Sequence, residues 1–171
     1  YFNSHQYPKA LEYYNTYIQR NENKEKDTNL ALSYNNIGTV YEEKEEYQKA
    51  LEYYFKSLEV KKVVHGDNHV EIATSYDTIG ILYYRRGEYE KGLEYCFKAL
   101  EMRKMLSNGN HNTMALSYNN LGLLYDAQGE GNKALEYYSK SLEIYKSFHG
   151  DNHPSVATSY LNIGMIYANQ K

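Results

Sequence analysis

The stretch from Ser33 to Tyr41 reads SYNNIGTVY, and it returns three times at intervals of 42 residues. The later copies are SYDTIGILY from Ser75, SYNNLGLLY from Ser117 and SYLNIGMIY from Ser159. A second string alternates with the first, as YPKALEYY from Tyr7, YQKALEYY from Tyr47, YEKGLEYC from Tyr89 and GNKALEYY from Gly131. Recurrence at a fixed period of this length indicates an array of similar structural units, here about four of them.

Both strings have the spacing of a helix that buries one face. The stripe of small and apolar residues in the first string consists of Ala31, Tyr34, Ile37, Gly38 and Tyr41. The stripe in the second string consists of Tyr47, Ala50, Leu51, Tyr54 and Leu58. This periodicity predicts two helices per unit, which we call the first and the second helix of each unit. The chain is therefore expected to consist of α-helices and turns.

The turns inside the units differ in one residue. Gly87 and Gly129 follow two of the first helices, where glycine permits the left-handed conformation that ends a helix. Glu45 and His5 stand at the same place in the other copies, so those turns are expected to be slightly strained or differently shaped. The copy that begins at Gly131 lacks the tyrosine of the other second helices, so we expect it to be the weakest unit.

The links between units carry signals for a new helix. They read HGDNHVE from His65 and HGDNHPS from His149. Asn68 and Asn152 can accept hydrogen bonds from the free amides of the following helix, and Pro154 suits a first helical turn. The sequence therefore predicts helices that begin just after these asparagines.

These strings resemble the tetratricopeptide repeat, through the residues Tyr34, Ile37, Gly38, Tyr41, Ala50, Tyr54 and Ser57 and their counterparts. The period of 42 residues exceeds the usual 34, and the longer second helix with its GDNHP-like link resembles the kinesin light chain type. The resemblance implies an all-α, right-handed superhelical solenoid of antiparallel helix pairs. Residues 1–171 would form a single array of about four repeats that is truncated within a repeat at both ends.

The resemblance also implies that the first helices line a concave groove for a peptide, as in cargo adaptors. The groove candidates are the residues opposite the buried stripe, namely Asn35, Asn36, Thr39, Glu42, Asp77, Thr78, Ile81, Tyr84, Arg85, Asn119, Asn120, Leu123, Asp126, Asn162 and Met165. Asn36, Asn120 and Asn162 are in register, and their amides can both donate to and accept from an extended backbone. The alternative is that these asparagines bind only water or a neighbouring helix.

Charge narrows the class of partner. The chain has 19 basic and 22 acidic side chains and no long block of one sign, which argues against nucleic acid, since binding phosphates needs a basic face. The groove lacks the cations of a carboxylate clamp and carries Glu42, Asp77 and Asp126, which favours a neutral or basic peptide. No apolar run is long enough to span a membrane, and a single cysteine is typical of a reducing compartment, so we expect an intracellular, cytoplasmic protein.

Other functional classes have weaker support in the sequence. His65, Asp67 and His69 have a metal-like spacing, but a helix end explains them without zinc, and Cys96 replaces a core aromatic. We expect no metal, no cofactor and no catalytic site. The alternative function is a structural or self-associating array whose main contacts are with other copies or with other domains of the parent protein, and we also expect end-to-end contact between copies. It would use Tyr13, Tyr14 and Tyr17 at one end and Ile163, Ile166 and Tyr167 at the other.

Overall fold

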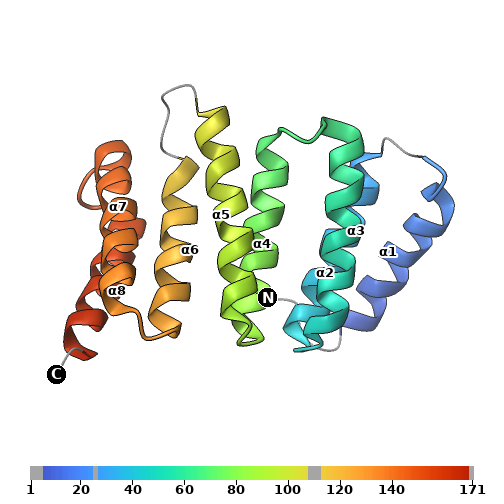
Figure 1. The fold of residues 1–171 in the computed structure, drawn as a ribbon. Helices are drawn as coiled ribbons and strands as arrows, with labels where there is room; N and C mark the ends of the chain where they lie inside the picture. The colour runs from blue at the N-terminus through green and yellow to red at the C-terminus, as the bar shows by residue number, and fades with distance from the viewer. Residues whose placement is uncertain (1–5, 25–26, 108–112, 170–171) are drawn as a thin grey trace.

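The computed structural model describes residues 6–24, 27–107 and 113–169, and Figure 1 shows these as a row of helices that runs from the first helix at one end to the last two at the other. The described part contains eight α-helices: α1 (Tyr7–Asn21), α2 (Thr28–Glu43), α3 (Tyr47–His65), α4 (Val70–Arg85), α5 (Tyr89–Leu106), α6 (Met114–Ala127), α7 (Gly131–His149) and α8 (Pro154–Asn169). The predicted all-α array of paired helices is confirmed. Its right-handed superhelical twist remains a prediction.

The tightest packing joins α2 to α3, α4 to α5 and α6 to α7, which are the first and second helices of one unit. Weaker contacts connect α3 to α4, α5 to α6 and α7 to α8, so each unit stacks on the next. The first helices α4 and α6 also contact each other directly. Because neighbouring units supply the remaining contacts, the core runs along the whole array.

Glycine in α2, α4 and α6 allows the second helix of the same unit to approach closely. A methyl group at Gly38 would lie 2.6 Å from the Tyr54 ring, and one at Gly122 would lie 2.7 Å from the Tyr138 ring. A methyl group at Gly80 would lie 2.6 Å from the sulfur of Cys96, which is fully buried. Cys96 is therefore a core residue, as its place in the repeat predicted.

Tyrosine pairs line the same interfaces. Tyr41 stacks on Tyr53 with ring centroids 5.5 Å apart, and Tyr125 stacks on Tyr137 at 5.4 Å. The middle unit repeats the arrangement with Tyr83 and Tyr95 at 5.6 Å. The recurring tyrosines of the sequence are thus used mainly for packing between the helices of a unit.

The turns after the first helices have the backbone conformation that the sequence predicted. Gly87 and Gly129 adopt φ angles of 75° and 77°, and Glu45 is held at 59° in the same turn. Left-handed backbone is unfavourable for a residue with a Cβ atom. His5, at the equivalent place in the first copy, lies outside the described residues.

Glu45→Gly should raise the free energy of unfolding by about 0.5–1 kcal/mol, because it removes the left-handed strain at this turn. Chemical denaturation monitored by circular dichroism measures the change. The reverse substitution at the matching turn, Gly87→Glu, should lower stability by a similar amount. Equal stability of Glu45→Gly and the original chain would show that the turn carries no strain.

The helix caps differ from the prediction. The imidazoles of His69 and His153, and not the amides of Asn68 and Asn152, accept hydrogen bonds at the starts of α4 and α8. Each Nδ1 atom accepts from the backbone N–H two residues later at 3.2 Å. The helices begin one residue further along than a cap at asparagine requires, because His69 still has extended backbone. Pro154 is the first residue of α8, as predicted.

The start of α7 lacks an aromatic side chain that the other second helices have. Tyr47 and Tyr89 each pack against a buried core cluster at this position. Beside Gly131 a recess of about 420 Å³ remains, and it is lined by Asp126, Gly129, Gly131, Asn132, Ile166 and Asn169. The recess gives the expected weakness of this unit a structural basis.

Gly131→Tyr should raise the free energy of unfolding by about 1 kcal/mol, because tyrosine favours the helix more than glycine and fills part of the recess. Thermal and denaturant unfolding both measure this change in the free energy of unfolding. Gly131→Ala serves as the control, since alanine adds helix propensity without the ring. If alanine stabilises the chain as much as tyrosine does, packing in the recess contributes nothing.

The two ends of the array are only partly as predicted. Tyr13 in α1 and Tyr167 in α8 are 67% and 64% exposed. Ile166 is buried against Ala134 and Tyr138, so its predicted exposure is wrong. Ile166 faces α7 and therefore belongs to the interior of the array. None of the described helices is both long and apolar enough to cross a bilayer.

Candidate protein-binding groove

The predicted groove residues lie on the first helices, but they differ in exposure. Arg85 and Met165 are exposed, whereas Asp77 and Asn120 are buried. The half-buried residues are Asn35, Asn36, Thr39, Glu42, Thr78, Ile81, Tyr84, Asn119, Leu123, Asp126 and Asn162. Several of these residues have structural partners.

Asp77 and Asn120 do not belong to an open groove, which corrects the prediction for both. The Asp77 carboxylate forms an ion pair with the buried Arg103 guanidinium, which reaches it from α5, and Ser117 of α6 bonds both groups. Burial raises the pKa of the Asp77 carboxyl, while Arg103 and hydrogen bonds from Asn120 and Ser117 oppose the rise. This buried cluster joins three helices and two units.

The row of three asparagines is therefore interrupted. Asn120 is only 7% exposed, and the side-chain amide of Asn162 donates to the Asn119 side chain at 3.2 Å. Asn162 thus links α8 to α6, which matches the alternative in which asparagine bonds a neighbouring helix. Asn36 is half-buried on α2, and a role for it in peptide binding remains a prediction.

The acidic character expected of the groove is largely neutralised. Glu42 accepts a hydrogen bond from the Tyr54 hydroxyl at 2.5 Å and lies 3.2 Å from the Arg85 guanidinium. Asp77 is paired with Arg103. Because two of the three predicted acidic groups have cationic partners, the expectation of a basic peptide loses most of its support.

Two of the apolar candidates contribute to the core. Tyr84 lies beside Tyr89 with ring centroids 6.0 Å apart and packs against a buried cluster around Leu121. Leu123 packs against the cluster that contains Tyr138. By contrast Leu32, Leu116 and Met165 are 54%, 46% and 55% exposed and contribute apolar surface to the first helices.

A hollow of about 540 Å³ opens between α2 and α4, above the C-terminal end of α3. Its walls include the predicted groove residues Asn35 and Thr78 together with the exposed Leu32. The complete lining is Thr28, Ala31, Leu32, Asn35, Lys61, His65, His69, Glu71, Thr74 and Thr78. Part of the predicted groove is therefore a concave surface with both polar and apolar walls.

The charged groups of the hollow balance one another. Lys61 donates to the Ser75 hydroxyl at 3.0 Å and lies 3.5 Å from the Glu71 carboxylate. The imidazoles of His65 and His69 stack at 4.3 Å at one edge. With one lysine facing one glutamate, the hollow has no strong preference for a charged ligand.

Sequence reasoning missed Lys61 because it looked for groove residues only on the first helices. Lys61 is on α3, and the same position holds Arg103 in α5 and Tyr145 in α7. Lys61 and Arg103 both reach the next first helix, where they bond Ser75 and Ser117. Comparing this one position across the units could have identified it.

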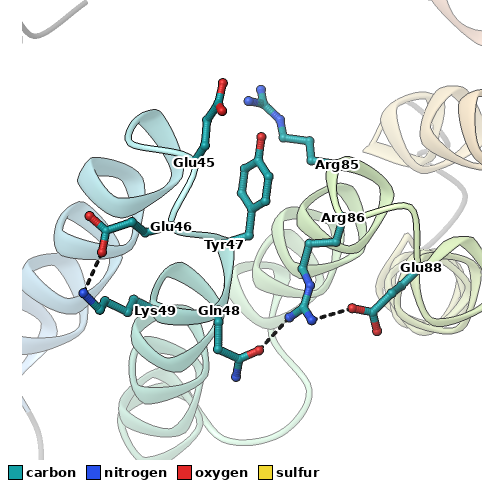
Figure 2. A pocket seen from close by; sticks show the side chains of 8 residues that line it. All are labelled: Glu45, Glu46, Tyr47, Gln48, Lys49, Arg85, Arg86 and Glu88. Carbon is teal, nitrogen blue, oxygen red and sulfur yellow. Dashed lines mark hydrogen bonds and ion pairs between the residues drawn. The ribbon is translucent and has the colours of Figure 1, made fainter.

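A second cleft, of about 560 Å³, lies where the turn after α2 meets the turn after α4. Figure 2 shows the Tyr47 ring between Glu45 and Arg85, with Arg86 bonded to Gln48 and Glu88. The next step of the array has a matching bond between Gln128 and Glu90. This repetition indicates that the polar network ties successive units together, so we assign it no ligand.

The histidines and the cysteine have structural surroundings. His149 and His153 stack at 4.2 Å, as the first histidine pair does, and the second member of each pair caps a helix. The residues that the structure describes include no cluster of three or more groups placed to hold a metal ion. Burial raises the pKa of the Cys96 thiol, which makes it a poor nucleophile.

Solved structures share this fold. BtubC (BKLC) from P. vanneervenii is 22% identical with a TM-score of 0.83, and the match covers 95% of this chain and 66% of that one. A putative kinesin light chain with nearly identical repeats from Podosopora anserina is 17% identical with a TM-score of 0.76, covering 95% and 78%. The apo form of RapI is 20% identical with a TM-score of 0.80, covering 96% and 44%.

The sequence itself matches one family model throughout. The model is described as the tetratricopeptide repeat, and its overlapping matches span residues 1–62, 29–104, 71–147 and 113–171. No curated protein matches the chain. Together with the paired helices and the kinesin-light-chain-like neighbours, these matches show that the chain belongs to the tetratricopeptide repeat family.

Proposed function

We propose that this chain is a protein-binding scaffold that holds an extended, uncharged peptide segment in the hollow between α2 and α4. Arrays of this family are in general protein–protein interaction modules, whose stacked units create extended concave surfaces. They usually carry no catalytic site, and we propose no reaction for this chain. The main support for this proposal is the hollow of about 540 Å³, whose lining includes Leu32, Asn35 and Thr78.

A comparison of the contacts between successive first helices supports the hollow between α2 and α4 as the binding site. Between α4 and α6 the Arg103 side chain is buried with Asp77, and between α6 and α8 Asn119 bonds Asn162. Between α2 and α4 the corresponding Lys61 leaves a hollow beside it. An extended backbone can bond the Asn35 amide, while an apolar side chain of the peptide packs on Leu32.

Leu32→Asp should weaken binding of a peptide partner about 10-fold or more, because a carboxylate replaces the apolar wall of the hollow. A peptide array incubated with the whole chain identifies ligands, and titration of the strongest gives the affinities. Leu116→Asp is the matched control, since Leu116 occupies the same position in the repeat and is similarly exposed on α6. It should leave the affinity nearly unchanged.

Both variants should melt like the original chain, because neither leucine is part of the core. Peptides that bind Leu32→Asp as tightly as the original chain would place their site elsewhere and overturn the proposal. A larger effect at Leu116 would move the site to α6. The alternative function, association of this chain with other copies, has its own structural support and a separate test.

A further inference from the structure

The outward face of α8 has the same residues as the faces that α2, α4 and α6 bury. Tyr160, Gly164 and Tyr167 stand where α2 has Tyr34, Gly38 and Tyr41. Tyr160 and Tyr167 are 50% and 64% exposed, and a methyl group at Gly164 would meet no atom within 4 Å. Tyr160, Gly164 and Tyr167 thus form a surface on which a second helix can pack, which we call the seat, and none of the described helices packs on it in this structure.

The equivalent faces of α2 and α6, which are covered by α3 and α7, show what kind of helix packs on such a surface. In α2–α3 and α6–α7 a tyrosine of the second helix stacks on the last tyrosine of the first helix, at 5.5 and 5.4 Å. A lysine lies over that same ring, at 5.2 Å for Lys49 over Tyr41 and 5.1 Å for Lys133 over Tyr125. The next tyrosine of the second helix then covers the glycine. Both α3 and α7 therefore place a lysine and two adjacent tyrosines against this face, while α5 keeps the lysine and the first tyrosine and has Cys96 in place of the second.

The helix α1 carries this pattern. Its Lys9, Tyr13 and Tyr14 correspond to Lys49, Tyr53 and Tyr54 of α3. Lys9 is exposed, and Tyr13 is 67% exposed because no first helix covers it among the described residues. The helices α8 and α1 therefore carry the two halves of the interface that α2–α3 and α6–α7 form.

We propose that the α8 face binds α1 of a second copy of this chain, which continues the series of interfaces α2–α3, α4–α5 and α6–α7. Tyr13 of one copy stacks on Tyr167 of the other, Lys9 lies over the Tyr167 ring, and Tyr14 covers Gly164. The surfaces are different, so the contact is head to tail and adds copies one after another. This inference does not depend on the peptide groove.

One residue limits the strength of the contact. Ser57 of α3 and Ser141 of α7 donate from Oγ to the carbonyl oxygens of Ala31 and Ala115, at 2.7 and 2.8 Å. In α1 the same position is Tyr17, whose hydroxyl donates to Asp27 at 2.8 Å. A tyrosine ring is larger than the space that serine fills there. We therefore expect weak association, which Tyr17→Ser strengthens.

Sedimentation velocity of the whole chain over increasing concentration tests the proposal. The original chain should show growing species, and Gly164→Ala should weaken their formation about 10-fold, since a methyl group at Gly38 would lie 2.6 Å from the Tyr54 ring. Tyr17→Ser should shift association to lower concentration. The control is Leu161→Ser, which removes an exposed apolar side chain from α8 outside the seat.

The outcomes separate this contact from unspecific association. Leu161→Ser should associate like the original chain, and a circular dichroism melt should show Gly164→Ala folded and no less stable. A strict monomer for both the original chain and Tyr17→Ser would overturn the proposal. So would equal association of Gly164→Ala and the original chain, or a loss of association in Leu161→Ser.

Discussion

Asp77→Asn should lower the free energy of unfolding by about 3 kcal/mol or more, because it leaves the Arg103 guanidinium buried without a counter-charge. Arg103 is 4% exposed and bonds Ser117 in addition to Asp77, so water cannot replace the missing carboxylate without local opening. Urea denaturation at neutral pH measures the loss. We expect it to be the largest effect of any single polar substitution considered for this chain.

The next unit supplies the matched control. It has Asn119 and Tyr145 where this one has Asp77 and Arg103. The double variant Asp77→Asn, Arg103→Tyr copies that uncharged pair and should recover most of the lost stability, since no unpaired charge remains. If the double variant is as unstable as Asp77→Asn, or if Asp77→Asn alone costs nothing, the ion pair does not hold these helices together.

Gly122→Ala should destabilise the chain by about 1–3 kcal/mol, although alanine favours helices. The added methyl group would lie within 2.9 Å of three atoms of the Tyr138 ring, which is itself only 2% exposed. The ring cannot move away without disturbing the packing between α6 and α7. Thermal unfolding should show a clearly lower midpoint.

Gly164→Ala changes the same repeat position, and we expect it to change the free energy of unfolding in the opposite direction. The same repeat position on α8 has no neighbouring atom within 4 Å, so only the helix propensity changes and stability should rise by about 0.5–1 kcal/mol at low protein concentration. Equal effects at the two glycines would mean that close approach of the second helix does not explain their recurrence. The pair thus separates packing from propensity within one repeat position.

The helices and turns could be predicted from the sequence because the signals for them are local and recur in each unit. The buried stripes depend on residues three or four apart on one helix, and the turn glycines depend on backbone angles of single residues. The first residues of the helices were harder to predict than the helices themselves. Asparagine and histidine are adjacent at residues 68 and 69, and both can cap a helix, so the choice depended on which residue keeps extended backbone.

The sequence could identify part of a concave surface on the first helices, and peptide binding there remains a proposal. Leu32, Asn35 and Thr78 do line a hollow, as residues opposite the buried stripe should. Asp77 stands at the Asn35 position of the next unit and has the same helical phase, yet it is buried. Its burial depends on Arg103, which is 26 residues away on another helix.

The sequence by itself determined the helices and the repeat, because these follow from short-range periodicity repeated four times, and the family resemblance added the pairing of the helices. Only the tertiary structure decided which polar residues stay available to a partner. A side chain such as Lys61 or Arg103 extends from a second helix to the following unit, and its length and charge determine whether the space there stays open. That outcome depends on contacts between units, which the periodicity within one helix does not encode.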